Sequence, residues 1–139
     1  MAKENDQKLW RVKFIEYRTG LAIEPPTGYH MEIVARSSVS KYDLILANCT
    51  GIADNGYRGE YKMRFRILPL VSKTFAGKDK EEALKNIKEY IKTNNISLFV
   101  KGDKAGQLLL TKTEDAPVVE VEELTDTSRG SGGFGSTGK

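Results

Sequence analysis

The sequence has very few of the residues that form covalent or metal cross-links. Its 139 residues include one cysteine, Cys49, and one histidine, His30. A disulfide needs two thiols and a thiolate-based structural zinc site needs two to four, so neither can form within this chain. A single histidine also excludes multi-histidine metal centres.

Long apolar runs are also missing. No stretch approaches the roughly 18 to 20 apolar residues that a membrane-spanning helix needs. Residues 1–8 are polar and have no apolar segment behind them, which is not the pattern of a secretory signal. We therefore expect a cytoplasmic protein with no membrane partner.

The charge and size of the chain are ordinary. Its 22 basic and 19 acidic residues give a net charge of +3, a surplus too small to require a nucleic-acid partner. The length suits one domain with a hydrophobic core. We predict a single β domain over residues 1–128, followed by a glycine-rich tail over residues 129–139.

Short segments rich in aromatic and β-branched residues predict an all-β fold. In residues 61–67, Tyr61, Met63, Phe65 and Ile67 alternate with polar side chains, which is typical of a half-buried antiparallel strand. Many short strands separated by turn residues indicate a sandwich or barrel. The predicted strands are residues 10–17, 29–35, 61–67, 97–101, 107–110 and 118–124.

One segment has helical rather than strand periodicity. Residues 78–93 place apolar side chains at spacings of three and four among Lys and Glu, with Asp79 in position to cap the start. We predict one helix inserted into the β framework, over about residues 78–95. Two interpretations stay open: the helix covers an edge or face of the sheet, or it binds a partner such as a regulator.

The C-terminal tail cannot build a core because it is mostly glycine and small polar residues. It nevertheless contains Arg129 and Phe134, which suit a phosphate group and the face of a base. The tail is either a frayed end or a flexible segment that orders on a nucleotide.

Two further places could carry chemistry. Arg36, Ser37 and Ser38 combine a guanidinium group with two hydroxyls, a set suited to phosphate oxygens. The turn-rich stretch 51–60 contains Asp54 and Tyr57. Each signal is weak alone, because Asp-Asn-Gly is also a common turn sequence.

Taken together, these stretches resemble the trimeric dUTP pyrophosphatases (dUTPases). All but the first of that family's motifs are present in the family's order, and segment 19–29 resembles its intervening strand and turn. The resemblance covers most of the chain outside the helical insert and residues preceding the first strand. The matching stretches are residues 36–40, 46–60, 102–108 and 129–138.

The resemblance implies hydrolysis of dUTP to dUMP and pyrophosphate. Asp54 would be the general base that activates a water for attack on the α-phosphorus, which a carboxylate can do when cationic groups absorb the phosphate charge. Mg²⁺ would be bound mainly through the triphosphate, so no set of protein metal ligands is expected.

The same resemblance assigns the groups that bind the substrate. Asn48 and the backbone through Gly51 and Ile52 would read uracil in a narrow hairpin, while Tyr57 would pack under the deoxyribose and exclude a 2′-hydroxyl. The remaining contacts would come from Arg36, Ser37, Ser38 and Gln107 on the phosphate chain, Arg129 on the γ-phosphate, Phe134 on the uracil face, and Gly135, Ser136 and Thr137 on phosphate oxygens.

The family forms homotrimers of jelly-roll-like subunits with active sites between subunits, closed by the tail of one chain. We therefore expect a jelly-roll-like barrel or sandwich with one inserted helix, assembled as a homotrimer. One chain therefore need not contain a whole active site.

Two departures from the family keep other functions open. The first motif, whose Asp supports the metal, is missing. Residues 42–44, which include Asp43, match it only in part. A catalytically impaired, dUTP-binding regulatory protein is therefore an alternative to the enzyme. The related dCTP deaminases are a further alternative, against which Tyr57 and Phe134 argue. The second departure is the helical insert, which adds no catalytic group.

Overall fold

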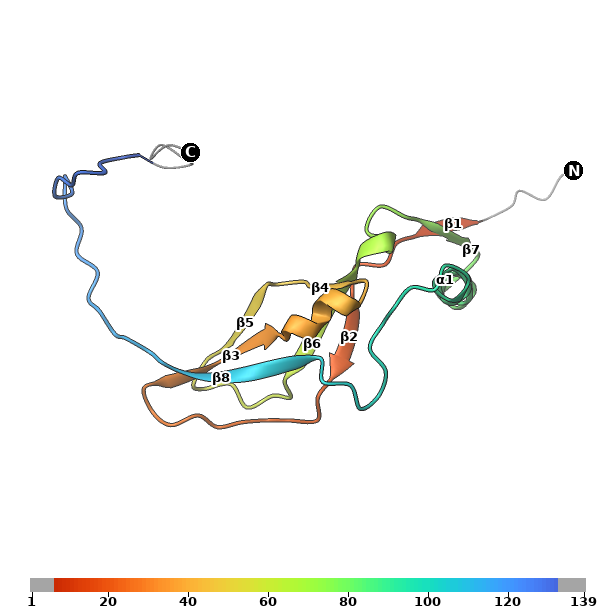
Figure 1. Cartoon of the computed structure of the whole chain (residues 1–139), viewed down its shortest axis with the longest axis horizontal. Coiled ribbons are helices and arrows are strands. Elements are labelled where there is room, and N and C mark those ends of the chain that lie inside the picture. The colour runs from red at the N-terminus through yellow and green to blue at the C-terminus, as the bar shows by residue number, and fades with distance from the viewer. Residues whose placement is uncertain (1–6, 133–139) are drawn as a thin grey trace, which may run out of the picture.

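The protein is described from a computed structural model that covers residues 7–132. These residues form short antiparallel strands and one α-helix (Figure 1). The elements are β1 (Lys8–Trp10), β2 (Ile15–Arg18), β3 (Tyr29–Ala35), the 3₁₀ helix η1 (Ser37–Lys41), β4 (Leu44–Leu46), β5 (Thr50–Ala53), β6 (Lys62–Ile67), the 3₁₀ helix η2 (Leu68–Leu70), β7 (Phe75–Gly77), α1 (Lys80–Thr93) and β8 (Gly106–Lys112).

The strands form two three-stranded sheets and a two-stranded sheet. Their orders are β2-β6-β4, β5-β3-β8 and β1-β7, and every pairing is antiparallel. In β6, Met63, Phe65 and Ile67 are buried and the side chains between them are exposed. The alternation predicted from the sequence is therefore confirmed, and it directs one face of β6 into the core.

The core lies against the buried face of β6. Phe65 is fully buried and meets Tyr17 and Phe99 edge to face, with ring centroids 5.9 and 5.4 Å apart. This geometry is favourable for aromatic rings. A second, smaller cluster is centred on Met31, Ala53 and Tyr61. It underlies the candidate site described below.

The predicted helix is confirmed and packs at one end of the molecule. Figure 1 shows α1 beside β1 and β7, away from β3, β5 and β8. Asp79 caps the helix by accepting a hydrogen bond of 2.9 Å from the backbone N–H of Glu82. Ala83 is buried against β7, and Asn86 donates to the carbonyl of Ala76 at 2.8 Å. The insert therefore covers the β1-β7 sheet.

Three strand predictions are wrong in part or in full. Segment 10–17 is divided between β1 and β2, because β1 pairs with β7 and β2 pairs with β6. Segment 97–101 is not a strand: the backbone N–H groups of Ser97 and Val100 donate to the carboxylates of Asp43 and Asp103, at 2.7 and 2.9 Å. These side chains satisfy the groups that a neighbouring strand would otherwise pair.

Segment 118–124 also forms no strand within the described chain. Val118 is 97% exposed and Leu124 is 87% exposed, so nothing among residues 7–132 covers their side chains. Strand propensity alone cannot form a strand without a partner. Figure 1 shows the chain after β8 running away from the sheets.

The turn between β4 and β5 holds Cys49 in the left-handed region, with φ of 59°, and leaves its thiol exposed. No helix within residues 7–132 is both long and apolar enough to cross a membrane.

Candidate functional site

A pocket of about 250 Å³ forms beside the β4–β5 hairpin. We call it the hairpin pocket; it lies between β3, the hairpin and the loop that leads into β6. It brings together five of the residues assigned to catalysis, base reading and sugar packing. Its lining residues are Ile33, Asn48, Gly51, Ile52, Ala53, Asp54, Tyr57, Tyr61 and Lys62.

The β4–β5 hairpin is narrow where it borders this pocket. A Cβ atom at Gly51 would lie 3.2 Å from Nδ2 of Asn48 and 3.4 Å from Cβ of Ile33. The first distance is tighter than an ordinary van der Waals contact and the second is at its lower limit, so a side chain at this position would press on Asn48. The absence of one lets a ligand approach the backbone here.

Asp54 follows β5, and its carboxylate is exposed at the edge of the pocket. The turn that carries it is well anchored. The backbone carbonyl of Asp54 accepts from the N–H of Tyr57 at 3.0 Å. The next side chain, Asn55, donates to the carbonyls of Pro26 and Tyr29 at 2.8 and 3.0 Å. Asp54 is therefore an accessible carboxylate on a fixed backbone, the arrangement that a general base requires.

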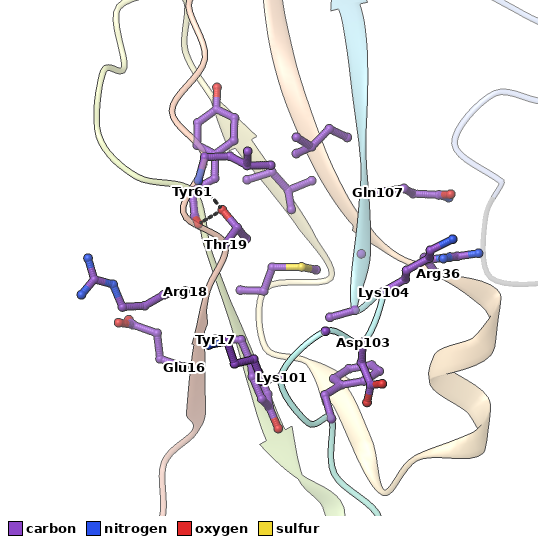
Figure 2. Close-up of a pocket in the computed structure, with 18 of the residues that line it drawn as sticks. Glu16, Tyr17, Arg18, Thr19, Arg36, Tyr61, Lys101, Asp103, Lys104 and Gln107 are labelled. Carbon is purple, nitrogen blue, oxygen red and sulfur yellow. Dashed lines mark hydrogen bonds between the residues drawn. The ribbon is translucent and has the colours of Figure 1, made fainter.

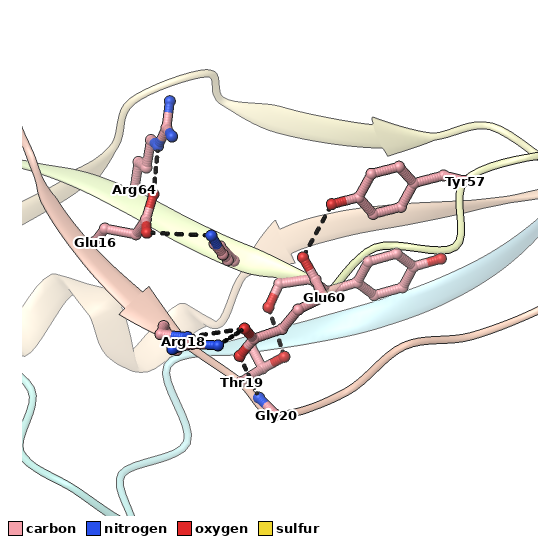
Figure 3. A network of polar contacts seen from close by, with 9 residues as sticks. Glu16, Arg18, Thr19, Gly20, Tyr57, Glu60 and Arg64 are labelled. Carbon is pink, nitrogen blue, oxygen red and sulfur yellow. Dashed lines mark hydrogen bonds and ion pairs between the residues drawn. The ribbon is translucent and has the colours of Figure 1, made fainter.

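Tyr57 lies over the inner wall of the same pocket. Its ring stacks on the ring of Tyr61, with centroids 5.7 Å apart and planes 10° apart. Its hydroxyl donates to the backbone carbonyl of Glu60 at 3.0 Å (Figure 3). Tyr57 thus presents an aromatic face in a fixed orientation while 44% of the residue stays exposed.

A second and larger pocket, about 830 Å³, lies between the end of β2 and the start of β8 (Figure 2). We call it the β2–β8 pocket. It contains Arg36 and Gln107, two of the residues assigned to the phosphate chain, together with Lys101 and Lys104. The cationic groups suit an anionic ligand, and the carboxylates of Glu16 and Asp103 line the same pocket. Ser37 and Ser38 begin η1 directly after Arg36.

The two pockets are separate cavities that share a wall. Ile33 and Tyr61 line both of them. Within residues 7–132, the candidate base Asp54 and the candidate phosphate-binding residues Arg36 and Gln107 therefore line different cavities of a single chain.

Ion pairs link β2 to β6 and to the loop that precedes β6 (Figure 3). Arg18 and Glu60 pair at 2.6 Å, and Glu60 also accepts from the backbone N–H of Gly20 at 2.9 Å. The hydrogen bond from Arg18 holds the pKa of Glu60 below its ordinary value. Likewise, Arg64 donates to Glu16 at 2.8 Å and lowers the pKa of that carboxyl.

Sequence reasoning missed the supporting roles of Glu60 and Tyr61. The alternation of residues 61–67 placed Tyr61 on the buried face, but that pattern does not reveal a stacking partner. Glu60 follows Tyr57 by three residues, and this proximity was the one available signal. Its partners Arg18 and Gly20 are distant in sequence and adjacent only in the fold.

The site offers oxygen ligands rather than a metal cage. Within the described chain, no three His, Cys, Asp or Glu side chains are grouped so that they could hold a metal ion. Mg²⁺ prefers oxygen ligands and is often bound through substrate phosphates with only one or two carboxylates. Asp54 in the hairpin pocket and Asp103 in the β2–β8 pocket are of that type. Asp43 lines neither pocket and instead holds Ser97.

Comparison with known proteins decides the family. No family model matches the chain. A deoxyuridine 5′-triphosphate nucleotidohydrolase of Finegoldia magna is 36% identical over 136 residues, which are 97% of this chain and 78% of that protein. Another, of Nautilia profundicola, is 35% identical over 122 residues, covering 87% of this chain and 69% of that protein. The chain belongs to the dUTPase family.

A third relative is longer than this chain. The deoxyuridine 5′-triphosphate nucleotidohydrolase of Thermobifida fusca is 38% identical over 122 residues, and the match spans 55% of its length. All three relatives carry the name of the dUTP-hydrolysing enzyme, dUTP diphosphatase.

Solved dUTPase structures share the fold. The dUTPase of Staphylococcus bacteriophage 80alpha with dUpNHpp superposes with a TM-score of 0.59 at 20% identity, covering 96% of this chain and 81% of that one. The D95N mutant dUTPase of phage phi11 of S. aureus superposes with a TM-score of 0.55 at 18% identity, covering 86% and 80%. That phage dUTPase structure is described as revealing the coordination of a structural Mg(II) ion. At these identities the likeness concerns the fold.

The tail residues that the dUTPase resemblance assigns are only partly described. Arg129 lies in a turn, where its Nε donates to the carbonyl of Gly132 at 2.9 Å, and it lines neither pocket. Phe134, Gly135, Ser136 and Thr137 lie outside the described residues.

Proposed function

We propose that the chain hydrolyses dUTP to dUMP and pyrophosphate, a reaction that keeps uracil out of DNA. The observation that carries this proposal is the hairpin pocket, in which Asp54, Tyr57 and the Asn48–Ile52 hairpin of a dUTPase family member meet. A carboxylate, an aromatic face and a narrow backbone loop supply a base, a sugar platform and an edge for a pyrimidine.

In the proposed reaction, Asp54 accepts a proton from a water as the water oxygen bonds to the α-phosphorus. The bond from that phosphorus to the bridging oxygen breaks, and pyrophosphate leaves with the electron pair. Arg36, Ser37, Ser38, Gln107 and Arg129 hold the phosphate oxygens. Donors placed around a phosphate stabilise the charge that moves during such a transfer. Mg²⁺, when bound with the triphosphate, neutralises part of that charge.

Substrate selection is proposed to rest on shape. Asn48 and the backbone at Gly51 and Ile52 read uracil. A Cβ added at Gly51 would lie 3.2 Å from Nδ2 of Asn48, and this limited space supports selection against larger bases. Tyr57 packs under the deoxyribose and leaves no room for a 2′-hydroxyl. From the tail, Phe134 stacks on the uracil, and Gly135, Ser136 and Thr137 close on the phosphates.

We further propose a homotrimer of jelly-roll-like subunits with active sites between chains. Two features support it. The candidate base Asp54 and the candidate phosphate-binding residues Arg36 and Gln107 line different pockets of one chain. The extended segment 118–124 exposes Val118, Val119 and Leu124, which another copy could cover. In this arrangement residues 1–128 form the β domain and residues 129–139 close a site.

The deciding experiment measures pyrophosphate release from dUTP with Mg²⁺, using dCTP and UTP as controls. We expect turnover of dUTP alone, and a loss of about 10² to 10⁴-fold in kcat for Asp54→Asn, the usual contribution of a general base. No dUTP turnover by the unmodified chain, or equal turnover of UTP, would contradict the proposal.

The missing first motif motivates a second candidate, a dUTP-binding regulatory protein that does not turn its ligand over. Asp43, the residue that partly echoes that motif, is engaged with Ser97 and lines neither pocket. Saturable dUTP binding without pyrophosphate release would favour this candidate. In either case α1, none of whose residues line the hairpin pocket or the β2–β8 pocket, is the surface we propose for a regulator.

A further inference from the structure

The ring of Tyr57 is fixed by three neighbours that follow it in the chain. It stacks on Tyr61 with 10° between the planes, and its hydroxyl donates to the carbonyl of Glu60. The third neighbour is Gly59, which leaves room for the ring. A Cβ atom at position 59 would lie 2.5 Å from the Tyr57 hydroxyl oxygen and 2.7 Å from Cζ. Any larger residue there would have to displace Tyr57.

Tyr61 is itself held rigidly. It is 1% exposed and packs in the cluster with Met31 and Ala53. Its backbone N–H donates to the carbonyl of Leu21 at 2.8 Å, and its carbonyl accepts from the hydroxyl of Thr19 at 2.6 Å. Because the ring and backbone of Tyr61 are both held in place, the Tyr57 ring that stacks on it is held in place as well.

Unlike its well-packed ring, the hydroxyl of Tyr61 makes no favourable contact within residues 7–132 that explains its position. It is buried, and it has no hydrogen-bond partner among the described residues. A buried polar group without a partner is costly, so the hydroxyl is not what stabilises this residue. The useful part of Tyr61 is the flat aromatic surface beneath Tyr57.

We propose that Tyr61 and Gly59 are positioning residues that set the pose of Tyr57, and with it the discrimination between 2′-deoxyribose and ribose nucleotides. The inference rests on the proposed function, in which Tyr57 packs under the sugar. To exclude the 2′-hydroxyl by shape, the Tyr57 ring must stay in place. A small displacement of the ring would be enough to admit a single added atom.

Two pairs of variants test this inference. Gly59→Ala places a methyl group against Tyr57 and leaves Tyr61 unchanged. Gly56→Ala is its matched control in the same loop, because a Cβ at Gly56 meets no atom within 4 Å. Tyr61→Leu removes the stacking surface, and Tyr61→Phe restores that surface without the hydroxyl.

The readout is the ratio of kcat/KM for dUTP to kcat/KM for UTP. We expect Gly59→Ala and Tyr61→Leu to lower this ratio by about tenfold or more, mainly through improved use of UTP. Gly56→Ala should keep the ratio, and Tyr61→Phe should recover what Tyr61→Leu loses. A merely structural role would lower both activities together and leave the ratio unchanged. If Tyr61→Leu does not fold, Gly59→Ala decides.

Failure of this inference can be separated from failure of the proposed function. If the unmodified chain prefers dUTP and Gly59→Ala keeps the same preference, the inference alone is wrong. If the unmodified chain turns over no dUTP, crystal structures of Gly59→Ala and Gly56→Ala still test the positioning. Displacement of the Tyr57 ring is expected in the first and not in the second, and an unmoved ring in Gly59→Ala would overturn the inference.

Discussion

The side-chain amide of Asn55 donates a hydrogen bond of 3.0 Å to the backbone carbonyl of Tyr29. The same nitrogen lies 3.1 and 2.8 Å from the carbonyl oxygens of Pro25 and Pro26. One amide therefore ties the turn that carries Asp54 to the turn that precedes β3. The candidate base depends on this tie for its position, although Asn55 itself lines neither pocket.

The first prediction concerns this tie. Asn55→Asp replaces the donor by an acceptor and directs a negative charge at three carbonyl oxygens. We expect the free energy of unfolding to fall by about 1 to 3 kcal/mol, the range for lost hydrogen bonds and groups left without partners. Urea unfolding measures it. Asp54→Asn is the matched control, because no intramolecular hydrogen bond of its side chain is found among residues 7–132, and it should change stability by less than about 0.5 kcal/mol.

The second prediction concerns the start of α1. Asp79→Ala removes the acceptor for the N–H of Glu82 and should cost about 0.5 to 2 kcal/mol of stability. Amide hydrogen exchange in α1, followed beside thermal unfolding, would locate the effect. Asp79→Ser keeps a capping oxygen and should recover most of the loss. Asp115→Ala, in the exposed segment after β8, controls for the removal of a negative charge. Equal stability of the Asp79→Ala and Asp115→Ala variants would contradict the capping role.

The third prediction concerns pH. Because the pKa of Glu60 lies below the ordinary value of 4.5, the folded chain holds this carboxylate ionised more strongly than the unfolded chain does. Its contribution to stability is therefore present above pH 4.5 and is lost as the pH falls through the lowered pKa of the folded state. The stability difference between the unmodified chain and Glu60→Gln should accordingly be largest near neutral pH and shrink in acid.

Denaturant unfolding at a series of pH values checks this expectation. Glu120→Gln, on the exposed segment after β8, is the control for net charge. If the stability difference between the unmodified chain and Glu60→Gln instead grows as the pH falls, the expected pH dependence of the Glu60–Arg18 ion pair is wrong.

The fourth prediction follows from the two separate pockets. Asp54→Asn disables the hairpin pocket and Arg36→Ala disables the β2–β8 pocket, so neither variant should turn over dUTP well alone. If each active site takes the two pockets from different copies, mixed assemblies will contain some sites with both pockets intact. Co-refolding the two variants should then restore measurable turnover.

The control for that mixing experiment pairs Asp54→Asn with Asp54→Ala. Both variants damage the same pocket, so this mixture should show no recovery. A mixture of Asp54→Asn with Arg36→Ala that stays at the sum of its separate activities would place a complete site within one chain.

Much of the fold could be predicted because the informative patterns are local. Alternation over residues 61–67 directed Met63 and Phe65 into the core, and three- and four-residue spacings gave α1. The strand predictions for segments 97–101 and 118–124 were wrong for the same reason. Strand propensity does not specify which neighbouring strand a segment will pair with. The first has carboxylate acceptors at Asp43 and Asp103 instead of a strand, and the second has no partner in the described chain.

The candidate site likewise has a part that could be predicted from local sequence and a part that depends on contacts between distant segments. Asn48, Asp54 and Tyr57 belong to one continuous stretch, so their meeting in the hairpin pocket follows from local chain geometry. The positions of Arg36 and Gln107 in another pocket depend on the pairing of β3 with β8, which joins segments far apart in sequence. The stacking of Tyr57 on Tyr61 could not be predicted from the sequence. Strand alternation predicts that Tyr61 is buried, but it does not predict which side chain packs against it.

The exposed thiol of Cys49, held by the left-handed turn between β4 and β5, has a practical consequence. It is the only thiol in the sequence, and it follows Asn48 at the rim of the hairpin pocket. A maleimide fluorophore would therefore attach at one known position, and its emission would report events at the hairpin without any substitution. Purification in air carries the matching hazard, since two such hairpins can be joined by an intermolecular disulfide.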